Sequence, residues 1–341
     1  MQNFYENREF HFFVGSDFLS SLNSILSPVQ KELLVVESIM HEEIQSNNSD
    51  LAAALDQILL SGGKRIRPAI SLLISRVLGG PVEKIHLLAA SVEILHSATL
   101  VHDDLIDGAL IRRGIQTLNA KWSAGATVLS GDYLFSCSAK LAAETESTRV
   151  VKRFAETLSI IVNGEITQLF KGPCHLDREE YYQRIYAKTA SLFETCAYCS
   201  ALLCTDDPKV QDAFKVYGRE IGMAFQIIDD ILDFTGDQAT LGKPIGNDLH
   251  QGLLTLPLQI YAERYPQRNF VQEILSGNCV DDNESIKELI TDLVSTEAIQ
   301  ESLNIAKEFS NRGIKAIEGF PPSEPHESLI ELAKFIVNRD L

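Results

Sequence analysis

The stretch from Ile85 to Asp107, IHLLAASVEILHSATLVHDDLID, carries the strongest structural signal in the sequence. Its apolar residues recur at the three- and four-residue spacing of an α-helix. The segment ends in three acidic residues within five positions, Asp103, Asp104 and Asp107. Carboxylates on so apolar a helix are costly to bury unless they are charge-paired or bound to a metal ion.

A second segment, QIIDDILD at 226–233, repeats this pattern with Asp229, Asp230 and Asp233. Positions i and i+4 of a helix share a face, so each motif should project a pair of carboxylates in one direction. A solvated acidic face is the alternative interpretation, but the neighbouring residues Leu105 and Ile231 indicate interior helices. Mg²⁺ prefers hard oxygen ligands and binds through one or two carboxylates together with substrate phosphates. Two such helices therefore predict a diphosphate held through metal ions.

The rest of the chain is also helical in pattern. No proline lies between Pro81 and Pro173 or between Pro208 and Pro244, and apolar stripes at helical spacing recur in 151–170 and 211–235. Alternating strand patterns are nearly absent. We predict an all-α protein of ten or more helices, several of them apolar on most faces and therefore central in a bundle.

Length and charge restrict the class of protein. The 341 residues contain no low-complexity linker, so we expect one helical domain over 31–341 after an N-terminal extension over 1–30. A net charge of −17 disfavours binding to nucleic acid or to anionic membranes. No apolar run suggests a transmembrane segment, and residues 1–25 do not resemble a signal peptide.

Six cysteines in a chain of this length do not form a disulfide scaffold. Cys196 and Cys199 make a single C-x-x-C in an apolar segment, which disfavours structural zinc. We expect reduced thiols and a cytoplasmic location.

Basic residues accompany the acidic motifs. Gly62-Gly63-Lys64-Arg65-Ile66-Arg67-Pro68 places three cations beside two glycines, and Arg112 and Arg113 follow the first motif. Lys188 and Lys243 lie further along. Each alone is typical of a surface charge, but Arg forks and Lys ammonium groups also suit phosphate oxygens.

Taken in order, these motifs resemble the trans-isoprenyl diphosphate synthase (polyprenyl synthase) family, of the medium- or long-chain type. The matching segments run from residue 62 to 257, with a helical pattern over nearly the whole chain. They are Gly-Gly-Lys-Arg-Ile-Arg-Pro at 62–68, His-Asp-Asp-Leu-Ile-Asp at 102–107, Arg112-Arg113-Gly114, Gly164-Glu165 with Gln168, Lys188-Thr189, Phe225-Gln226 with Asp229-Asp230 and Asp233, and Gly242-Lys243-Pro244 with Gly246 and Asp248-Leu249.

The resemblance implies a helical bundle around a deep central cavity, usually as a homodimer, and a set of site residues. Mg²⁺, as three ions with substrate bound, would be held by Asp103, Asp107 and Asp229, with Asp104, Asp230 and Asp233 supporting. An allylic diphosphate would be held by Arg112, Lys188, Gln226 and Lys243. Isopentenyl diphosphate would be held by Lys64, Arg67, His96 and Arg113. Thr189 and Gln226 would stabilise a carbocation through their oxygen dipoles.

The implied reaction is Mg²⁺-dependent, head-to-tail condensation of isopentenyl diphosphate with geranyl, farnesyl or geranylgeranyl diphosphate. The product would be an all-trans polyprenyl diphosphate. A transient contact with a membrane is one way in which the enzyme could release it. One position departs from many short-chain members of the family: Leu253 stands where a phosphate-binding lysine often follows the glycine, here Gly252.

The product's length should depend on residues one or more helical turns before Asp103, namely Ala98, Thr99, Leu95 and Ser91. Short-chain members carry a bulky aromatic at one of the first positions, whereas Ala98 and Thr99 are small. A bulky residue at these positions would pack against the growing chain and stop its growth early. Because both residues are small, we expect a product of roughly six to nine isoprene units. Geranylgeranyl or farnesyl diphosphate is the alternative product. A terpene cyclase and a non-catalytic synthase subunit are rival classes of protein, and the two intact Asp motifs disfavour both.

Overall fold

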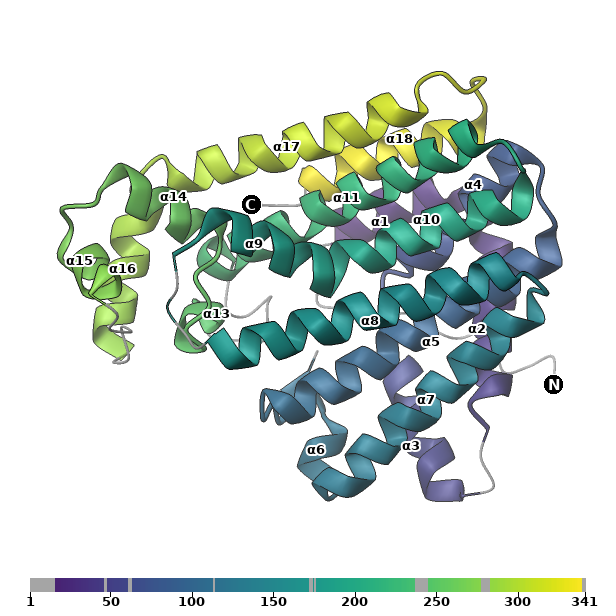
Figure 1. Ribbon diagram of the computed structural model, residues 1–341, viewed down its shortest axis with the longest axis horizontal. Helices are drawn as coiled ribbons and strands as arrows, with labels where there is room; N and C mark the ends of the chain where they lie inside the picture. The colour runs from purple at the N-terminus through teal and green to yellow at the C-terminus, as the bar shows by residue number, and fades with distance from the viewer. Residues whose placement is uncertain are drawn as a thin grey trace.

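The computed structural model describes residues 16–45, 48–60, 63–112, 114–171, 174, 176–236, 245–276 and 283–338. These residues are almost entirely helical, which confirms the predicted all-α class (Figure 1). The helices are α1 (Ser16–Leu26), η1 (Ser27–Val29), α2 (Gln30–Glu43), α3 (Ser49–Leu60), α4 (Ile66–Leu78), α5 (Val82–Ile106), α6 (Leu118–Lys121), α7 (Ala124–Glu144), α8 (Thr148–Lys171), α9 (Arg178–Ile185), η2 (Tyr186–Ala190), α10 (Ser191–Cys204), α11 (Pro208–Thr235), α13 (Asn247–His250), α14 (Leu256–Arg264), α15 (Asn269–Leu275), α16 (Asn283–Val294), α17 (Ala298–Ile317) and α18 (Glu324–Val337). A two-stranded antiparallel hairpin, β1 (Ile111–Arg112) and β2 (Ile115–Gln116), follows α5.

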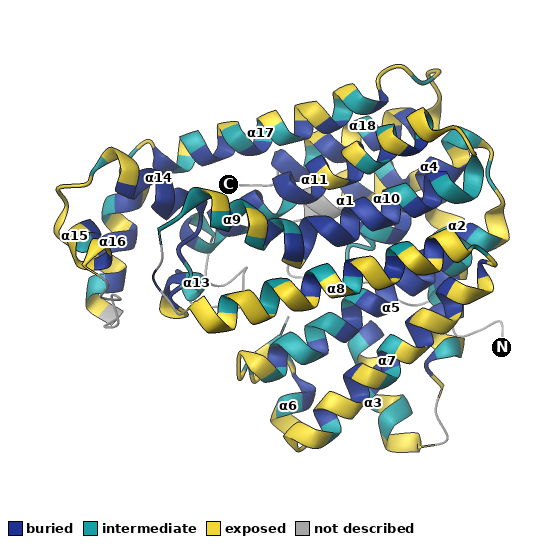
Figure 2. Cartoon of the chain, viewed as in Figure 1, coloured by how far each residue is buried: buried dark blue, intermediate teal, exposed yellow. Residues whose placement is uncertain are grey.

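Helix α5 lies near the middle of the bundle, as its apolar sequence predicts. Figure 2 shows that it is coloured mostly as buried, and α2, α4, α7 and α10 all pack against it. By length and composition it is also a candidate membrane span, but most of its apolar window is buried inside the protein. The sequence prediction considered only continuous apolar runs. It therefore did not single out α5, in which polar residues interrupt the apolar ones.

The helices α10 and α11 pack so closely that only glycine fits at two positions of α11. A Cβ atom at Gly218 would lie 2.5 Å from the backbone oxygen of Phe193, and one at Gly222 would lie 2.6 Å from the Cα atom of Ala190. Contacts this short are not tolerated in a close-packed interior. The small residues therefore bring the helix that carries the second Asp motif directly against η2 and α10.

The N-terminal helix α1 belongs to the same packed unit as the rest of the chain. Leu22 and Leu26 are buried in the common hydrophobic core, and α1 contacts α18. Helices α1 and η1 thus share the core of the bundle. The predicted boundary at residue 30, between an N-terminal extension and the helical domain, stays a prediction.

Two local features are a helix cap and the state of the cysteines. The side chain of Asn48 accepts hydrogen bonds from the backbone N–H groups of Asp50 and Leu51, so it caps α3. Cys196 and Cys199 are buried free thiols. Cys174, in contrast, is disulfide-bonded, so the expectation of reduced thiols is wrong there. Disulfide pairing depends on Cα distances that the fold decides and that sequence spacing does not show.

Candidate active site

The first Asp motif lies at the C-terminal end of α5. Asp103 is the last-turn residue that faces Lys188, with 14% of its side chain exposed, and Asp107 is exposed beyond the end of the helix. Asp104 is buried and accepts a 2.6 Å hydrogen bond from Nε of Arg112 on β1. The middle aspartate thus fixes the hairpin to α5, while Asp103 and Asp107 lie closer to solvent.

The second Asp motif, on the last two turns of α11, repeats this division. Asp230 is buried and accepts hydrogen bonds from the Tyr181 hydroxyl at 2.7 Å and from the Gln226 amide at 2.8 Å. Asp229 is only half-buried. Asp233 accepts from the backbone N–H groups of Asn247 and Asp248 at 3.2 and 3.1 Å, so it holds the start of α13.

Lys188 lies between carboxylates of two helices. Its Nζ atom is 3.0 Å from Glu165 on α8 and 3.8 Å from Asp103 on α5. The sequence predicts no role for Glu165, because only the fold brings this end of α8 close to Lys188 of η2. The cluster joins the first Asp motif to the predicted allylic-diphosphate lysine.

Burial is the main cause of the raised pKa of Asp103, which reaches about 6. Lys188 lowers this pKa, whereas the nearby carboxylates Glu165 and Asp107 raise it further. Arg112 also lowers this pKa, by less than Lys188 does, and the two cations together do not offset the effect of burial. An additional cation at this end of α5 would stabilise the ionised carboxylates.

A hydrogen-bond chain leads from the Lys-Thr pair to the second motif. The Thr189 hydroxyl donates to the Gln226 side-chain oxygen at 2.6 Å, and the Gln226 amide donates to Asp230. Tyr181 completes the chain through its bond to Asp230, and burial together with Asp248 raises the pKa of that carboxyl. Tyr181 was missed by the sequence analysis, which contains no signal that links α9 to α11.

The segment that carries Lys188 and Thr189 is a π-helical turn, Tyr186–Ala190. Such turns are rare and concentrate at functional sites, since they change which way consecutive side chains point. Here Lys188 reaches toward α5 and α8, while Thr189 reaches toward α11. The turn therefore connects the two Asp motifs.

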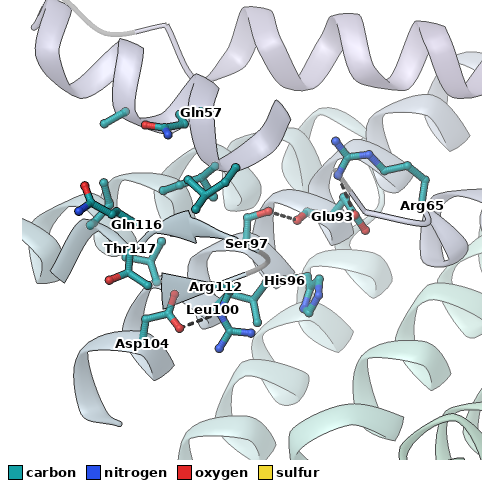
Figure 3. A pocket seen from close by; sticks show the side chains of 15 residues that line it. Gln57, Arg65, Glu93, His96, Ser97, Leu100, Asp104, Arg112, Gln116 and Thr117 are labelled. Atoms are coloured by element: carbon teal, nitrogen blue, oxygen red, sulfur yellow. Dashed lines mark hydrogen bonds and ion pairs between the residues drawn. The ribbon is translucent and has the colours of Figure 1, made fainter. Parts of the chain in front are cut away.

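Three of the predicted isopentenyl diphosphate residues lie at or near the N-terminus of α4 and the middle of α5. The Arg67 guanidinium lies 4.4 Å from the centroid of the Phe193 ring, and the Cys196 thiol donates to the Arg67 carbonyl at 2.9 Å. Lys64 is half-buried just before α4. His96 lines a small pocket of about 60 Å³ beside α5, together with Arg65, Glu93, Asp104 and Arg112 (Figure 3).

Two predicted residues, Lys243 and Arg113, lie outside the described part of the chain. Within that part, no group of three or more His, Cys, Asp or Glu side chains is already gathered for a metal ion.

The predicted wall residues lie on α5 before the first motif. Leu95, Ala98 and Ser91 are fully buried, and Thr99 is half-buried with its hydroxyl bonded to the His96 carbonyl at 2.8 Å. The Ser91 hydroxyl donates to the Ser138 carbonyl of α7 at 2.8 Å. Ser91 thus lies in the contact between α5 and α7, and the role of all four residues in setting product length stays a prediction.

The site thus consists of two aspartate motifs on separate helices of an all-α bundle, joined by a Lys-Thr turn. The sequence profile of the polyprenyl synthetase family matches residues 48–293. The chain belongs to this family.

Similar proteins include members of known name. The chain is 33% identical over 320 residues to octaprenyl diphosphate synthase of Haemophilus influenzae, covering 89% of this chain and 96% of the relative. It is 35% identical over 321 residues to heptaprenyl diphosphate synthase component 2 of Geobacillus stearothermophilus, covering 94% and 99%. A crystal structure of polyprenyl synthase from Caulobacter crescentus, complexed with calcium and isoprenyl diphosphate, is similar with a TM-score of 0.86 and 30% identity, covering 93% and 98%.

Proposed function

We propose that this prenyltransferase condenses isopentenyl diphosphate head-to-tail with an allylic diphosphate and releases a medium- to long-chain all-trans polyprenyl diphosphate. The observation that carries the proposal is the placement of Lys188 and Thr189 on one π-turn between the two Asp motifs. One side of this turn is suited to a departing diphosphate, and the other is suited to a developing carbocation.

In this proposal the chain's cations hold the leaving group. The Lys188 ammonium group, already beside Asp103, would bind an oxygen of the allylic diphosphate. The allylic C–O bond breaks, and the diphosphate leaves with the electron pair. The Thr189 hydroxyl oxygen, which keeps its lone pairs while its proton points to Gln226, would face the allylic cation.

The double bond of isopentenyl diphosphate then attacks the allylic carbon and forms the new C–C bond. Loss of a proton from the neighbouring carbon gives the trans double bond of the product. The departing diphosphate is the proposed acceptor, because the two Asp motifs are committed to cations and hydrogen bonds.

The metal in this proposal is Mg²⁺, which Asp103, Asp107 and Asp229 would hold together with the substrate's diphosphate, as three ions when substrate is bound. When bound, Mg²⁺ would neutralise the negative charge on the departing diphosphate. The support is the raised pKa of Asp103, which burial causes and the nearby cations do not offset, together with the calcium and isoprenyl diphosphate in the similar Caulobacter structure.

For product length we propose roughly six to nine isoprene units, because Ala98 and Thr99, about one helical turn before Asp103, are too small to limit growth by close packing. The octaprenyl and heptaprenyl names of similar proteins support this range. A geranylgeranyl-length product is the runner-up, since Leu95, fully buried about one turn before Thr99 on α5, would form a floor for the growing chain.

We further propose that the protein works as a homodimer through α7 and α8. Large apolar side chains are exposed on both helices, among them Leu129, Leu169 and Phe170, the last at 87% exposure. Exposed apolar patches of this kind mark interaction surfaces. A partner of different sequence is the alternative, because one similar protein is named as a component of its synthase. The cytoplasmic location stays a prediction.

Incubation with labelled isopentenyl diphosphate and farnesyl diphosphate tests the reaction, with Asp103→Asn as the inactive control. The proposal requires label in a longer prenyl diphosphate and its loss in the variant. Cyclic hydrocarbon without label would indicate a cyclase, and no turnover by the wild-type homodimer would favour a subunit that needs a partner.

A further inference from the structure

Arg65 occupies an unusual backbone position between the two cations assigned to isopentenyl diphosphate, Lys64 and Arg67. It is the residue that caps α4, with φ 46° and ψ 33°, in the left-handed region. For a residue with a side chain this conformation costs roughly 1–2 kcal/mol. Such strain persists only where the surroundings hold it in place.

The Arg65 guanidinium supplies that hold through three elements. It donates to Glu93 of α5 at 2.9 Å, to Glu37 of α2 at 3.1 Å, and to the carbonyl of Leu59 at the end of α3 at 2.6 Å. The Arg65 side chain is only 15% exposed, and that of Glu93 is 6% exposed. An ion pair so shielded from solvent, with a fork of charge-assisted hydrogen bonds, is geometrically specific.

The same contacts connect the start of α4 to the turn of α5 that carries His96. Glu93 precedes His96 by one helical turn, and the Ser97 hydroxyl donates to the Glu93 carbonyl at 3.0 Å. Figure 3 shows Arg65, Glu93 and His96 around one pocket, with Arg65 bonded to Glu93. The ion pair therefore holds the start of α4 at a fixed position relative to the turn of α5 that carries His96.

We propose that Arg65, through its ion pair with Glu93, is a positioning residue for isopentenyl diphosphate: it sets the Lys64–Arg67 segment against His96. The inference rests on the proposed assignment of Lys64, Arg67 and His96 to that substrate. It assigns Arg65 no contact with the substrate, because each of its three guanidinium nitrogens already donates a hydrogen bond, to Glu37, Glu93 or the Leu59 carbonyl.

Three variants separate this role from simple stabilisation. Glu93→Gln keeps the shape and removes the charge, Arg65→Lys keeps the charge and removes the fork, and Arg65→Gly accepts the positive φ while removing the guanidinium. Each should raise the KM for isopentenyl diphosphate roughly tenfold, with the KM for farnesyl diphosphate within about twofold of wild type. Because glycine adopts a positive φ without strain, a change of KM in Arg65→Gly would result from loss of the side chain and not from a strained backbone.

The chain offers a matched control in another shielded Arg–Glu pair. Arg153 of α8 and Glu194 of α10 lie 2.7 Å apart, with side-chain exposures of 12% and 3%. Glu194→Gln should lower the Tm without raising the isopentenyl KM selectively. If Arg65→Gly does not fold, as judged by circular dichroism, Glu93→Gln and Arg65→Lys still give the KM comparison.

A lowered Tm with an unchanged KM for isopentenyl diphosphate in the folded Arg65 and Glu93 variants would overturn the inference. Lys64→Ala and Arg67→Ala separate this outcome from failure of the proposed function. If these two variants raise the isopentenyl KM and the Arg65 variants do not, the site stands and the positioning role is wrong. If Lys64→Ala and Arg67→Ala leave that KM unchanged, the site assignment itself is wrong.

Discussion

At the scale of single residues, the aspartates of each motif have different surroundings. Asp104 and Asp230 are buried and bonded to Arg112 and Tyr181, whereas Asp103 remains beside Lys188 near the exposed Asp107. Because the sequence shows only identical acidic letters, this difference depends on partners that the fold supplies. In the first motif, burial raises the pKa of Asp103 to about 6.

The raised pKa of Asp103 predicts how pH affects metal binding. Below about pH 6 the carboxyl is protonated, and a proton competes with Mg²⁺ for it. The Mg²⁺ concentration for half-maximal activity should therefore rise as the pH falls from about 7.5 to about 5.5, and added Mg²⁺ should restore activity. Titration of activity with Mg²⁺ at both pH values measures this. An equal metal requirement at both would contradict the assignment.

The same shift predicts a stability change in the metal-free protein. A carboxyl whose folded pKa exceeds its unfolded pKa contributes stability that is present below the unfolded pKa of about 3.9 and is lost as the pH rises through about 6. Asp103→Asn removes the charge, so its Tm in EDTA should exceed that of wild type at about pH 7.5 and not at about pH 4. A lower Tm at the higher pH would show that the ion pair with Lys188 outweighs burial.

At the scale of elements, the site depends on how closely α10 and η2 approach α11. Gly218 and Gly222 permit this approach, and the Thr189–Gln226 hydrogen bond spans it. The π-turn at Tyr186–Ala190 then directs Lys188 to the other motif. The chemistry of two motifs far apart in sequence is thus joined by one helix contact.

Gly222→Ala should separate η2 from α11 and reduce activity. The added methyl group would meet Ala190 and Phe193, and overpacking of this kind costs roughly 1–3 kcal/mol. We expect a lower Tm and a lower kcat, because the Thr189–Gln226 bond is stretched. Gly125→Ala in α7 is the matched control, since nothing lies within 4 Å of its Cβ position. Equal kcat in the two variants would refute the role of this contact.

The wall assignment on α5 predicts a shorter product for Ala98→Phe. Ala98 is fully buried five residues before Asp103, so an aromatic ring there would occupy the space for the growing chain. Thin-layer chromatography of the dephosphorylated products measures their chain lengths. The product of the Ala98→Phe enzyme is compared with that of Ser91→Phe, in which the added ring lies at the α5–α7 contact. An unchanged product in a folded Ala98→Phe enzyme would show that the chain grows elsewhere.

At the scale of the whole molecule, the exposed apolar residues of α7 and α8 suggest a pair of subunits. The double variant Leu169→Asp, Phe170→Asp should behave as a monomer in multi-angle light scattering, while wild type behaves as a dimer. Leu275→Asp, an exposed leucine on α15, is the control and should leave the mass unchanged. A wild-type monomer at micromolar concentration would contradict the homodimer.

Much of this architecture is visible in the sequence, because helical periodicity and proline placement reflect local physics. The stripe through Ile85 and Leu95 predicted α5, and the repeated Asp pattern predicted the two motif helices. The partners of buried charges are not local. Glu165, Tyr181 and Glu93 gain their roles from helices distant in sequence, and the disulfide at Cys174 is decided by distances that spacing does not encode.

The most direct test of the central claim is incorporation of labelled isopentenyl diphosphate in the presence of farnesyl diphosphate, with Mg²⁺ or with EDTA. The account predicts a labelled prenyl diphosphate longer than the primer, formed with Mg²⁺, absent with EDTA and absent in both Asp103→Asn and Asp229→Asn. Elongation that persists in EDTA, or elongation by the two variants equal to that of wild type, would contradict it.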